Sequence, residues 1–262
     1  MKYQPRNRIF QRVIEDKPAL AMIDQRFLEV GERKGRPVLI TATAQYQDRT
    51  DDGLPGPGAA PQLDLIDEGI EKAADEHDGR IAATLTSDGL RTWLIYAAKV
   101  EPLLRAVSAS AKAAGPTGAG RPLGGGTGLL VRSEQDPAWT KFEAALPTAE
   151  EGRWNDDMAV IEQLEEHGDD HAVARPIEHL VLLPSKAAQD RFVTWARENG
   201  YEIAGVSERA REGAWAVECT MFSVIDIDAI FEQTCELTVE AEKLGGAYDG
   251  WQTRVVESQA GN

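Results

Sequence analysis

The same order of strand and helix patterns occurs twice along this chain, once in each half. Alternating or β-branched apolar residues indicate strands, and apolar residues three or four positions apart indicate helices. Asp88-Gly89 lies between two apolar runs and predicts a hairpin turn. The first half therefore predicts a strand, a helix, two strands, a helix and a strand at residues 37–47, 63–77, 79–97, 104–114 and 127–133. Apolar segments at 8–14 and 20–30 are expected to add one or two strands ahead of this series.

The second half repeats the series after a helical pattern at 155–167, for which Asn155 is the expected N-cap. A strand, a helix, two strands, a helix and a strand are predicted at residues 175–184, 185–199, 201–210, 213–224, 226–246 and 248–256. This β-α-β-β-α-β order is that of the ferredoxin-like split arrangement. Two helices on one face of such an antiparallel sheet leave the other face free for a partner.

The repeated order predicts an α+β protein made of two tandem ferredoxin-like α/β-sandwich domains with antiparallel sheets. A chain of 262 residues is also long for a single compact core. A proline, a glycine and an acidic pair separate the two patterned halves. We therefore expect domains at 1–147 and 155–257, joined by a linker at 148–154.

The net charge of −16 belongs almost entirely to the second half. Residues 1–147 contain 19 Lys and Arg and 20 Asp and Glu, a net charge of −1, which leaves −15 for residues 148–262. An acidic surface repels nucleic-acid backbones and attracts basic protein surfaces, although acidic residues also serve solubility alone. We expect a basic protein partner and no direct contact with nucleic acid.

The composition also indicates where in the cell the protein is expected to be. No stretch approaches the ~18 uninterrupted apolar residues of a membrane span, and the N-terminal segment has no apolar core or cleavage site typical of a signal peptide. Cys219 and Cys235 have no metal or redox spacing and are expected to be reduced. We therefore expect a cytoplasmic protein with no membrane partner and no cofactor.

Two glycine-rich segments are candidates for phosphate-binding loops. Gly245-Gly246 follows a predicted helix, whereas phosphate loops precede one, so we interpret the pair as a helix stop. The segment 115–128 has neither dinucleotide nor Walker spacing and is expected to be a flexible surface connection. Asp249-Gly250 is expected to turn or bulge the entry to the last strand.

Residues 165–171 offer the best metal candidates, because His167, Asp169 and His171 carry nitrogen and oxygen ligands within a few residues. Gly168 breaks the helix that would place both histidines on one face, and no metalloprotease motif accompanies them. His179 follows Glu178 in a strand, where neighbouring side chains point to opposite faces. The alternative hypothesis is a metal-dependent or small-molecule enzyme centred on the acidic loop His167–His171.

Residues 155–256 resemble the regulators of ribonuclease E activity, type B. The resemblance lies in Asn155-Asp156, Gly168-Asp169-Asp170, Arg175-Pro176-Ile177-Glu178-His179, and Gly245-Gly246 followed by Tyr248-Asp249-Gly250-Trp251. The first half is similar to an uncharacterised bacterial domain often joined to that family, at Asp52-Gly53-Leu54-Pro55, Gly89-Leu90-Arg91 with Tyr96, and Asp136-Pro137 with Trp139.

The resemblance implies a non-enzymatic protein that binds ribonuclease E or its degradosome scaffold and lowers its activity on RNA. The candidate partner-binding residues are Asp169, Asp170, Arg175, Glu178, His179, Tyr248, Asp249 and Trp251. Tyr248 and Trp251 either pack the fold or meet the partner, since large aromatic residues serve both roles. A structural module whose tandem domains support self-association is the third hypothesis.

Overall fold

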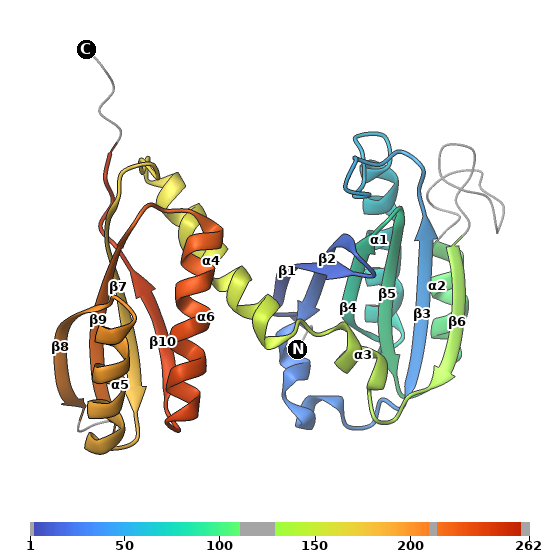
Figure 1. Ribbon diagram of the computed structural model, residues 1–262. Helices are drawn as coiled ribbons and strands as arrows, with labels where there is room; N and C mark the ends of the chain where they lie inside the picture. Colours follow the sequence, from blue (N-terminus) through green and yellow to red (C-terminus); the bar gives the residue numbers. More distant parts are fainter. Residues whose placement is uncertain (1–2, 111–128, 210–213, 258–262) are drawn as a thin grey trace, which may run out of the picture. The chain divides into compact units, whose positions relative to one another are not determined.

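The computed structural model describes residues 3–110, 129–209 and 214–257, and the chain divides into two compact units, Met1–Glu151 and Gly152–Asn262 (Figure 1). Each unit combines helices with one antiparallel sheet, as the α+β prediction requires. The glycine-rich segment 115–128 and residues 210–213, where the strands predicted at 201–210 and 213–224 meet, lie outside the described residues. None of the described helices is both long enough and apolar enough to cross a membrane.

The N-terminal unit contains a six-stranded sheet in the order β1-β2-β4-β5-β3-β6. Its strands are β1 (Asn7–Ile14), β2 (Lys17–Asp24), β3 (Val38–Gln45), β4 (Arg80–Ser87), β5 (Leu90–Ala97) and β6 (Leu129–Gln135). One or two strands were expected at 8–14 and 20–30; the structure has two, β1 and β2, which form a hairpin that extends the sheet beyond β4. Short 3-10 turns at Gln25–Leu28 and Val30–Arg33 follow this hairpin.

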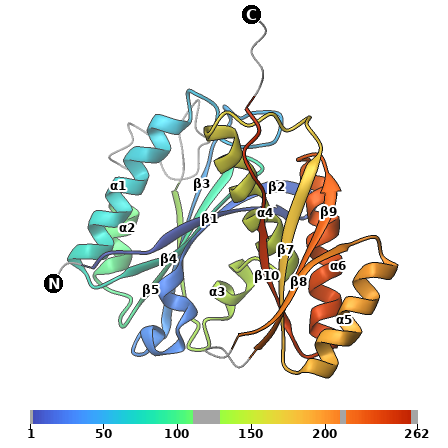
Figure 2. The same cartoon turned by 90° about the vertical axis from the view of Figure 1, so that its left-hand side faces the viewer.

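Helices lie on both faces of this sheet. Helices α1 (Ala60–Glu76) and α2 (Leu103–Ser110) cover one face, and α3 (Thr140–Ala145) lies on the other (Figures 1 and 2). The first face buries an aliphatic core that includes Ile66 and Ile70 of α1. The second buries an aromatic core made of residues such as Phe27, Tyr96, Trp139 and Phe142.

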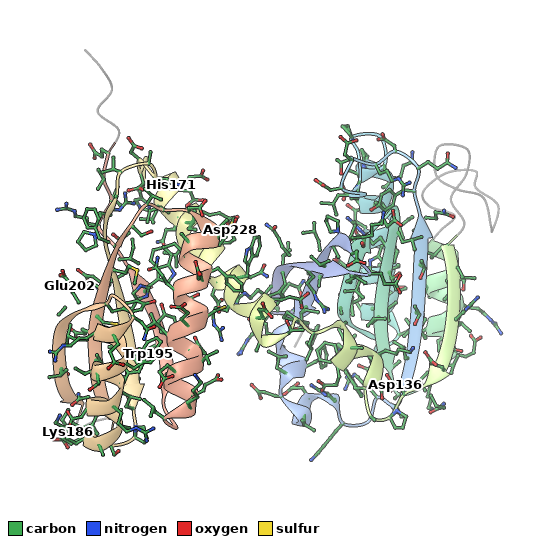
Figure 3. The ribbon with its side chains drawn as sticks, viewed as in Figure 1. Asp136, His171, Lys186, Trp195, Glu202 and Asp228 are labelled. Carbon is green, nitrogen blue, oxygen red and sulfur yellow. The ribbon has the colours of Figure 1, made fainter. Side chains whose placement is uncertain are left out.

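Asp136 organises the aromatic core of the N-terminal unit. Its carboxylate accepts hydrogen bonds from the Tyr96 hydroxyl at 2.7 Å and from the backbone amides of Thr140 at 2.8 Å and Lys141 at 3.0 Å (Figure 3). Burial raises the pKa of Asp136, but these hydrogen bonds outweigh it and hold the pKa below the usual value. The Tyr96 ring stacks on Trp139, with centroids 3.7 Å apart. The Asp-Pro-x-Trp motif is therefore structural.

The C-terminal unit contains a four-stranded antiparallel sheet in the order β10-β7-β9-β8. Its elements are α4 (Ala149–Glu166), β7 (Arg175–Leu183), α5 (Lys186–Glu198), β8 (Glu202–Arg209), β9 (Ala214–Ser223), α6 (Ile227–Lys243) and β10 (Ala247–Gln252). Ser185 and Asp226 cap α5 and α6 with their side-chain oxygens. Both helices pack on one face of the sheet, around buried residues such as Phe192 and Leu237 (Figure 1).

Helix α4 begins at Ala149 and continues to Glu166, so most of the segment 148–154 is helical, and the boundary between the two compact units, between Glu151 and Gly152, lies within that segment. Asn155 lies inside this helix and is buried, so it is not the N-cap. The Thr148 hydroxyl accepts a hydrogen bond from the Glu151 amide at 3.1 Å, and the Glu151 carboxylate accepts one from the Thr148 amide at 2.8 Å. This reciprocal capping box fixes the helix start at Ala149, six residues earlier than the apolar periodicity indicates.

The helix stop expected at Gly245-Gly246 is confirmed. Gly245 has φ of +74°, and the two glycine amides donate to the last carbonyls of α6. A Cβ atom on Gly246 would lie 2.3 Å from the Leu182 carbonyl oxygen, so the backbone of β10 approaches β7 more closely than alanine permits.

Gly246→Ala is therefore expected to lower the free energy of unfolding by about 1–3 kcal/mol, because the two strands must separate. Gly152→Ala in α4 is the matched control. Nothing lies within 4 Å of a Cβ there, so the higher helix propensity of alanine should stabilise the protein by about 0.5–1 kcal/mol. Urea denaturation measures both changes. Equal effects of the two substitutions would contradict the close approach at Gly246.

Candidate functional site

The two faces of β7 separate the predicted partner-binding residues. Arg175 and His179 are buried on the side covered by α5 and α6, whereas Glu178 is exposed on the opposite, uncovered side. On β10, Tyr248 pairs with Val181 and Trp251 pairs with His179, which places both aromatic side chains on the helix-covered side. The predicted set is therefore divided between the interior of the unit and its surface.

A bulge in β10 brings the two aromatic residues to the same side. Residues 248 and 251 of a regular strand would point to opposite faces. The pairing register shifts between Tyr248 and Gly250, so Asp249 is the extra residue, and Gly250 has φ of +118°. This confirms the bulge expected at Asp249-Gly250.

His179 forms part of a buried polar network. Its Nε2 lies 3.1 Å from the Gln233 side-chain oxygen and its Nδ1 lies 2.9 Å from the Tyr248 hydroxyl. Because the Gln233 oxygen only accepts, Nε2 carries the proton and Nδ1 accepts from Tyr248. Burial lowers the pKa of His179 to about 4, against the opposing effect of the Gln233 hydrogen bond, and burial also raises the pKa of Tyr248. His179 is thus a neutral interior residue at pH 7.

Asp157 of α4 holds Trp251. One carboxylate oxygen accepts a hydrogen bond from the Trp251 indole at 2.9 Å, and the other accepts one from the Thr234 hydroxyl at 2.7 Å. Burial raises the pKa of Asp157, although both hydrogen bonds favour the ionised carboxylate. The network therefore ties β10, α4 and α6 together beneath the helix layer.

Arg175 and Asp169 form a buried ion pair. Their side chains are 1% and 0% exposed, and Arg175 also donates to the backbone carbonyls of Asp170 and Val173, each at 3.1 Å. Asp169 accepts a further hydrogen bond from the Val256 amide at 2.7 Å, and the Asp170 amide donates to the Val256 carbonyl at 2.7 Å. The pair fastens the segment after β10 to the loop after α4.

The structure does not join the three metal candidates into one site. The His167 Nδ1 lies 2.6 Å from the Gln163 carbonyl oxygen of its own helix. His171 lies in the loop after α4, with its Nε2 3.7 Å from an Asp169 oxygen that Arg175 also contacts (Figure 3). Residues 3–110, 129–209 and 214–257 contain no group of three or more His, Cys, Asp or Glu side chains placed to hold a metal ion.

The uncovered face of the C-terminal sheet is concave and acidic. A depression of about 460 Å³ is lined by residues of all four strands, with Glu178 from β7, Glu218 from β9 and Asp249 from the β10 bulge. Gln252 donates to the Glu178 carboxylate at 2.8 Å. Glu202 projects from the edge strand β8 (Figure 3), and the Phe222 side chain on β9 is 71% exposed. Leu180 adds an apolar side chain to the lining of the depression.

Sequence reasoning missed several of these residues. Asp157, Gln233 and Thr234 complete the interior network from α4 and α6, and a single sequence carries no signal that pairs them with β7 and β10. The positions of Glu218 and Phe222 on the uncovered face could have been predicted from the sequence. Apolar residues alternate along β9 at Trp215, Val217, Cys219 and Met221, and this alternation places the even-numbered residues on the opposite face.

Two families match separate parts of this chain. Residues 154–253 match the family described as Regulator of ribonuclease activity B, and residues 8–121 match a family of unknown function, DUF695. A protein named Regulator of ribonuclease activity B from Xenorhabdus nematophila is 30% identical over 112 residues, which cover 42% of this chain and 79% of that relative. The chain belongs to the regulator of ribonuclease activity B family.

The part that matches the regulator of ribonuclease activity B family runs from α4 to β10, so it contains the interior network, the ion pair and the acidic depression. Both resemblances drawn from sequence motifs are confirmed. A crystal structure of an unknown protein from Galdieria sulphuraria aligns with 84% of this chain and 99% of that chain, at 10% identity and a TM-score of 0.22. A score at that level does not establish a shared fold.

Proposed function

We propose that this protein is a cytoplasmic, non-enzymatic regulator that binds ribonuclease E or its degradosome scaffold and lowers its activity on RNA. Membership of the regulator of ribonuclease activity B family supports this role. The observation that carries the proposal is the acidic depression on the uncovered face of the C-terminal sheet. We propose that a basic segment of the ribonuclease docks there.

The chemistry of this face suits a basic protein segment. The residues that line the depression include three carboxylates, Glu178, Glu218 and Asp249, and no lysine or arginine. Such one-sided charge speeds encounter with a basic partner and rejects acidic ones. Leu180 and the exposed ring of Phe222 add apolar area, which a purely electrostatic surface lacks.

The other predicted residues act indirectly in this proposal. Arg175, His179, Tyr248 and Trp251 hold β7 and β10 in place from beneath, and so shape the acidic face without touching the partner. The strand orders β10-β7-β9-β8 and β6-β3-β5-β4 support a ferredoxin-like classification for both units, with the β1–β2 hairpin added to the first.

Glu178→Lys combined with Glu218→Lys tests the proposed docking face. We expect this variant to inhibit cleavage of a model RNA by ribonuclease E about 10- to 100-fold less well than the wild type at ~0.1 M salt, because two attractions become repulsions. The control is Glu232→Lys combined with Glu236→Lys, which makes the same net charge change on the exposed side of α6. The control should inhibit nearly as well as the wild type.

Two outcomes would contradict the proposal in different ways. If the wild-type protein neither binds nor inhibits the ribonuclease, the proposed function is wrong. If both double variants lose inhibition equally, net charge and not the depression accounts for binding.

A further inference from the structure

The uncovered face of the C-terminal sheet carries a carboxylate on each of its four strands. In the strand order β10-β7-β9-β8 these belong to Asp249, Glu178, Glu218 and Glu202. Thr220 pairs with both Glu178 and Glu202, so these two glutamates lie in one row on the same face. Glu218 lies in the next row, and Asp249 is in the bulge at the β10 end of that row. The negative charge therefore extends across the strands and not along one of them.

These four carboxylates are available to a partner. All four residues are exposed, and none forms an ion pair with a side chain that the structure describes. The Glu178 carboxylate accepts a hydrogen bond from the neutral Gln252 amide, which leaves its charge uncompensated. Like charges on neighbouring strands repel one another, so a cationic ligand that bridges them gains more than one attraction.

Bulges in the two edge strands keep this face open at both sides. Both register shifts lie beside the same pair, Leu180 and Glu218: Gly250 of β10 pairs with Leu180, and Gly205 of β8 pairs with Glu218. No side chain projects from either glycine, and the lining of the depression extends from Gly250 to Ala204, the extra residue of the β8 bulge. Bulged edges also discourage the pairing of a further strand. We therefore expect a partner on the face and not along an edge.

We propose that the ribonuclease segment binds in an extended conformation across the four strands, with a basic residue at every second position. This inference rests on the docking face proposed above and adds the conformation and the residue spacing of the bound segment. The outer strands β10 and β8 are three spacings apart, ~14 Å. Alternate side chains of an extended chain point the same way and lie ~6.8 Å apart, so three of them span that width.

A helix fits this face less well. A docked helix buries a continuous apolar stripe. The two rows that contain the glutamates offer Leu180 as their one large apolar side chain, and their other members are glutamates, glycines, Thr220 and Gln252. Phe222, in the row beyond Thr220, adds a single exposed ring. An arginine guanidinium can stack on such a ring while it pairs with a carboxylate.

Two seven-residue peptides of the same composition test the proposal on the full-length protein. Both contain three arginines and four threonines. One has arginine at its second, fourth and sixth positions, and the other has its three arginines together. We expect the alternating peptide to bind about 3- to 10-fold more tightly at ~50 mM salt, because its arginines all face the carboxylates in an extended chain. Fluorescence anisotropy of the labelled peptides measures both affinities.

Glu202→Gln tests the outermost carboxylate. This variant should weaken binding of the alternating peptide about 2- to 5-fold at low salt, because one attraction is lost. Glu208→Gln is the matched control. Glu208 lies on the same strand and carries the same charge, but it pairs with Trp215, on the helix-covered side. The control should leave the affinity unchanged.

Ala204→Leu tests the path of the segment across β8. Ala204 is exposed and lines the depression, so a leucine there occupies the space of the bound chain without disturbing the core. The variant should weaken binding of the alternating peptide at least about 3-fold. Ser207→Leu, at an exposed position of β8 outside the depression, should have no effect.

Three results would overturn this proposal. Equal binding of the two peptides would show that net charge and not spacing governs binding. Equal effects of Glu202→Gln and Glu208→Gln would show that the bound segment does not reach the outermost carboxylate. Amide NMR shifts that the alternating peptide causes only along β8, with none at Glu178 or Thr220, would show that it adds to the sheet edge. Binding of the alternating peptide by a protein that fails to inhibit the ribonuclease would overturn the proposed function and support the binding mode.

Discussion

Arg175→Ala is expected to lower the free energy of unfolding of the C-terminal unit by about 3–5 kcal/mol. The substitution leaves the Asp169 carboxylate buried without its counter-charge and removes the donor that serves the carbonyls of Asp170 and Val173. Hydrogen exchange of β7, β10 and α6 in the full-length protein, measured against urea concentration, gives the change for this unit separately from the N-terminal unit.

Asp190→Ala provides the control for this prediction. It removes one partner of the Lys186–Asp190 pair, whose side chains are both more than half exposed, so it should change stability by less than about 0.5 kcal/mol. A partner-binding role for Arg175 predicts a different pattern, in which Arg175→Ala weakens ribonuclease binding and leaves the unfolding curve unchanged. That pattern would contradict the interior role assigned to this arginine.

Acidification from pH 7 to pH 4 is expected to remove about 3 kcal/mol of stability through His179 alone. Its pKa is lowered from 6.5 to about 4 in the folded protein, so the unfolded chain binds the proton more tightly. The stability associated with the neutral ring is present above pH 6.5 and is lost as the pH falls from 6.5 to about 4. A difference of about 2.5 pKa units at 1.36 kcal/mol per unit gives this magnitude.

His179→Gln isolates this contribution from other titrating groups. The variant should lose less stability than the wild type between pH 6.5 and pH 4, by about 3 kcal/mol, in urea denaturation followed at several pH values. Parallel profiles for the wild type and His179→Gln would show that the ring is not held neutral by the fold.

The order of elements could be predicted because local patterns determine it. Leu63, Ile66 and Ile70 recur at helical spacing and are all fully buried in α1. The start of α4 differs from the predicted one because the Thr148 and Glu151 capping box determines it, and these hydrogen bonds lie outside the apolar pattern. Helix boundaries depend on such local polar contacts more than on the buried stripe.

The sequence motifs identified the residues of the candidate site, but they predicted only part of what each side chain does. Arg175, His179, Tyr248 and Trp251 mark the family, yet their side chains serve the interior of the unit. Their partners come from segments up to 94 positions away, and one sequence cannot pair residues at that distance. The acidity of the second half can be counted from the sequence, but the meeting of Glu178, Glu218 and Asp249 at one depression depends on strand register and on the β10 bulge.

The β10 bulge separates the two aromatic residues that pack the interior from the acidic residue between them, which lines the depression. Tyr248 and Trp251 are held by His179 and Asp157, so their positions relative to β7 are fixed. Asp249 is the extra residue of the bulge and has no pairing partner on β7, and its side chain lines the depression. The contacts that hold both aromatic residues do not involve the Asp249 carboxylate. A substitution at this position therefore changes the charge of the depression without repacking a buried side chain.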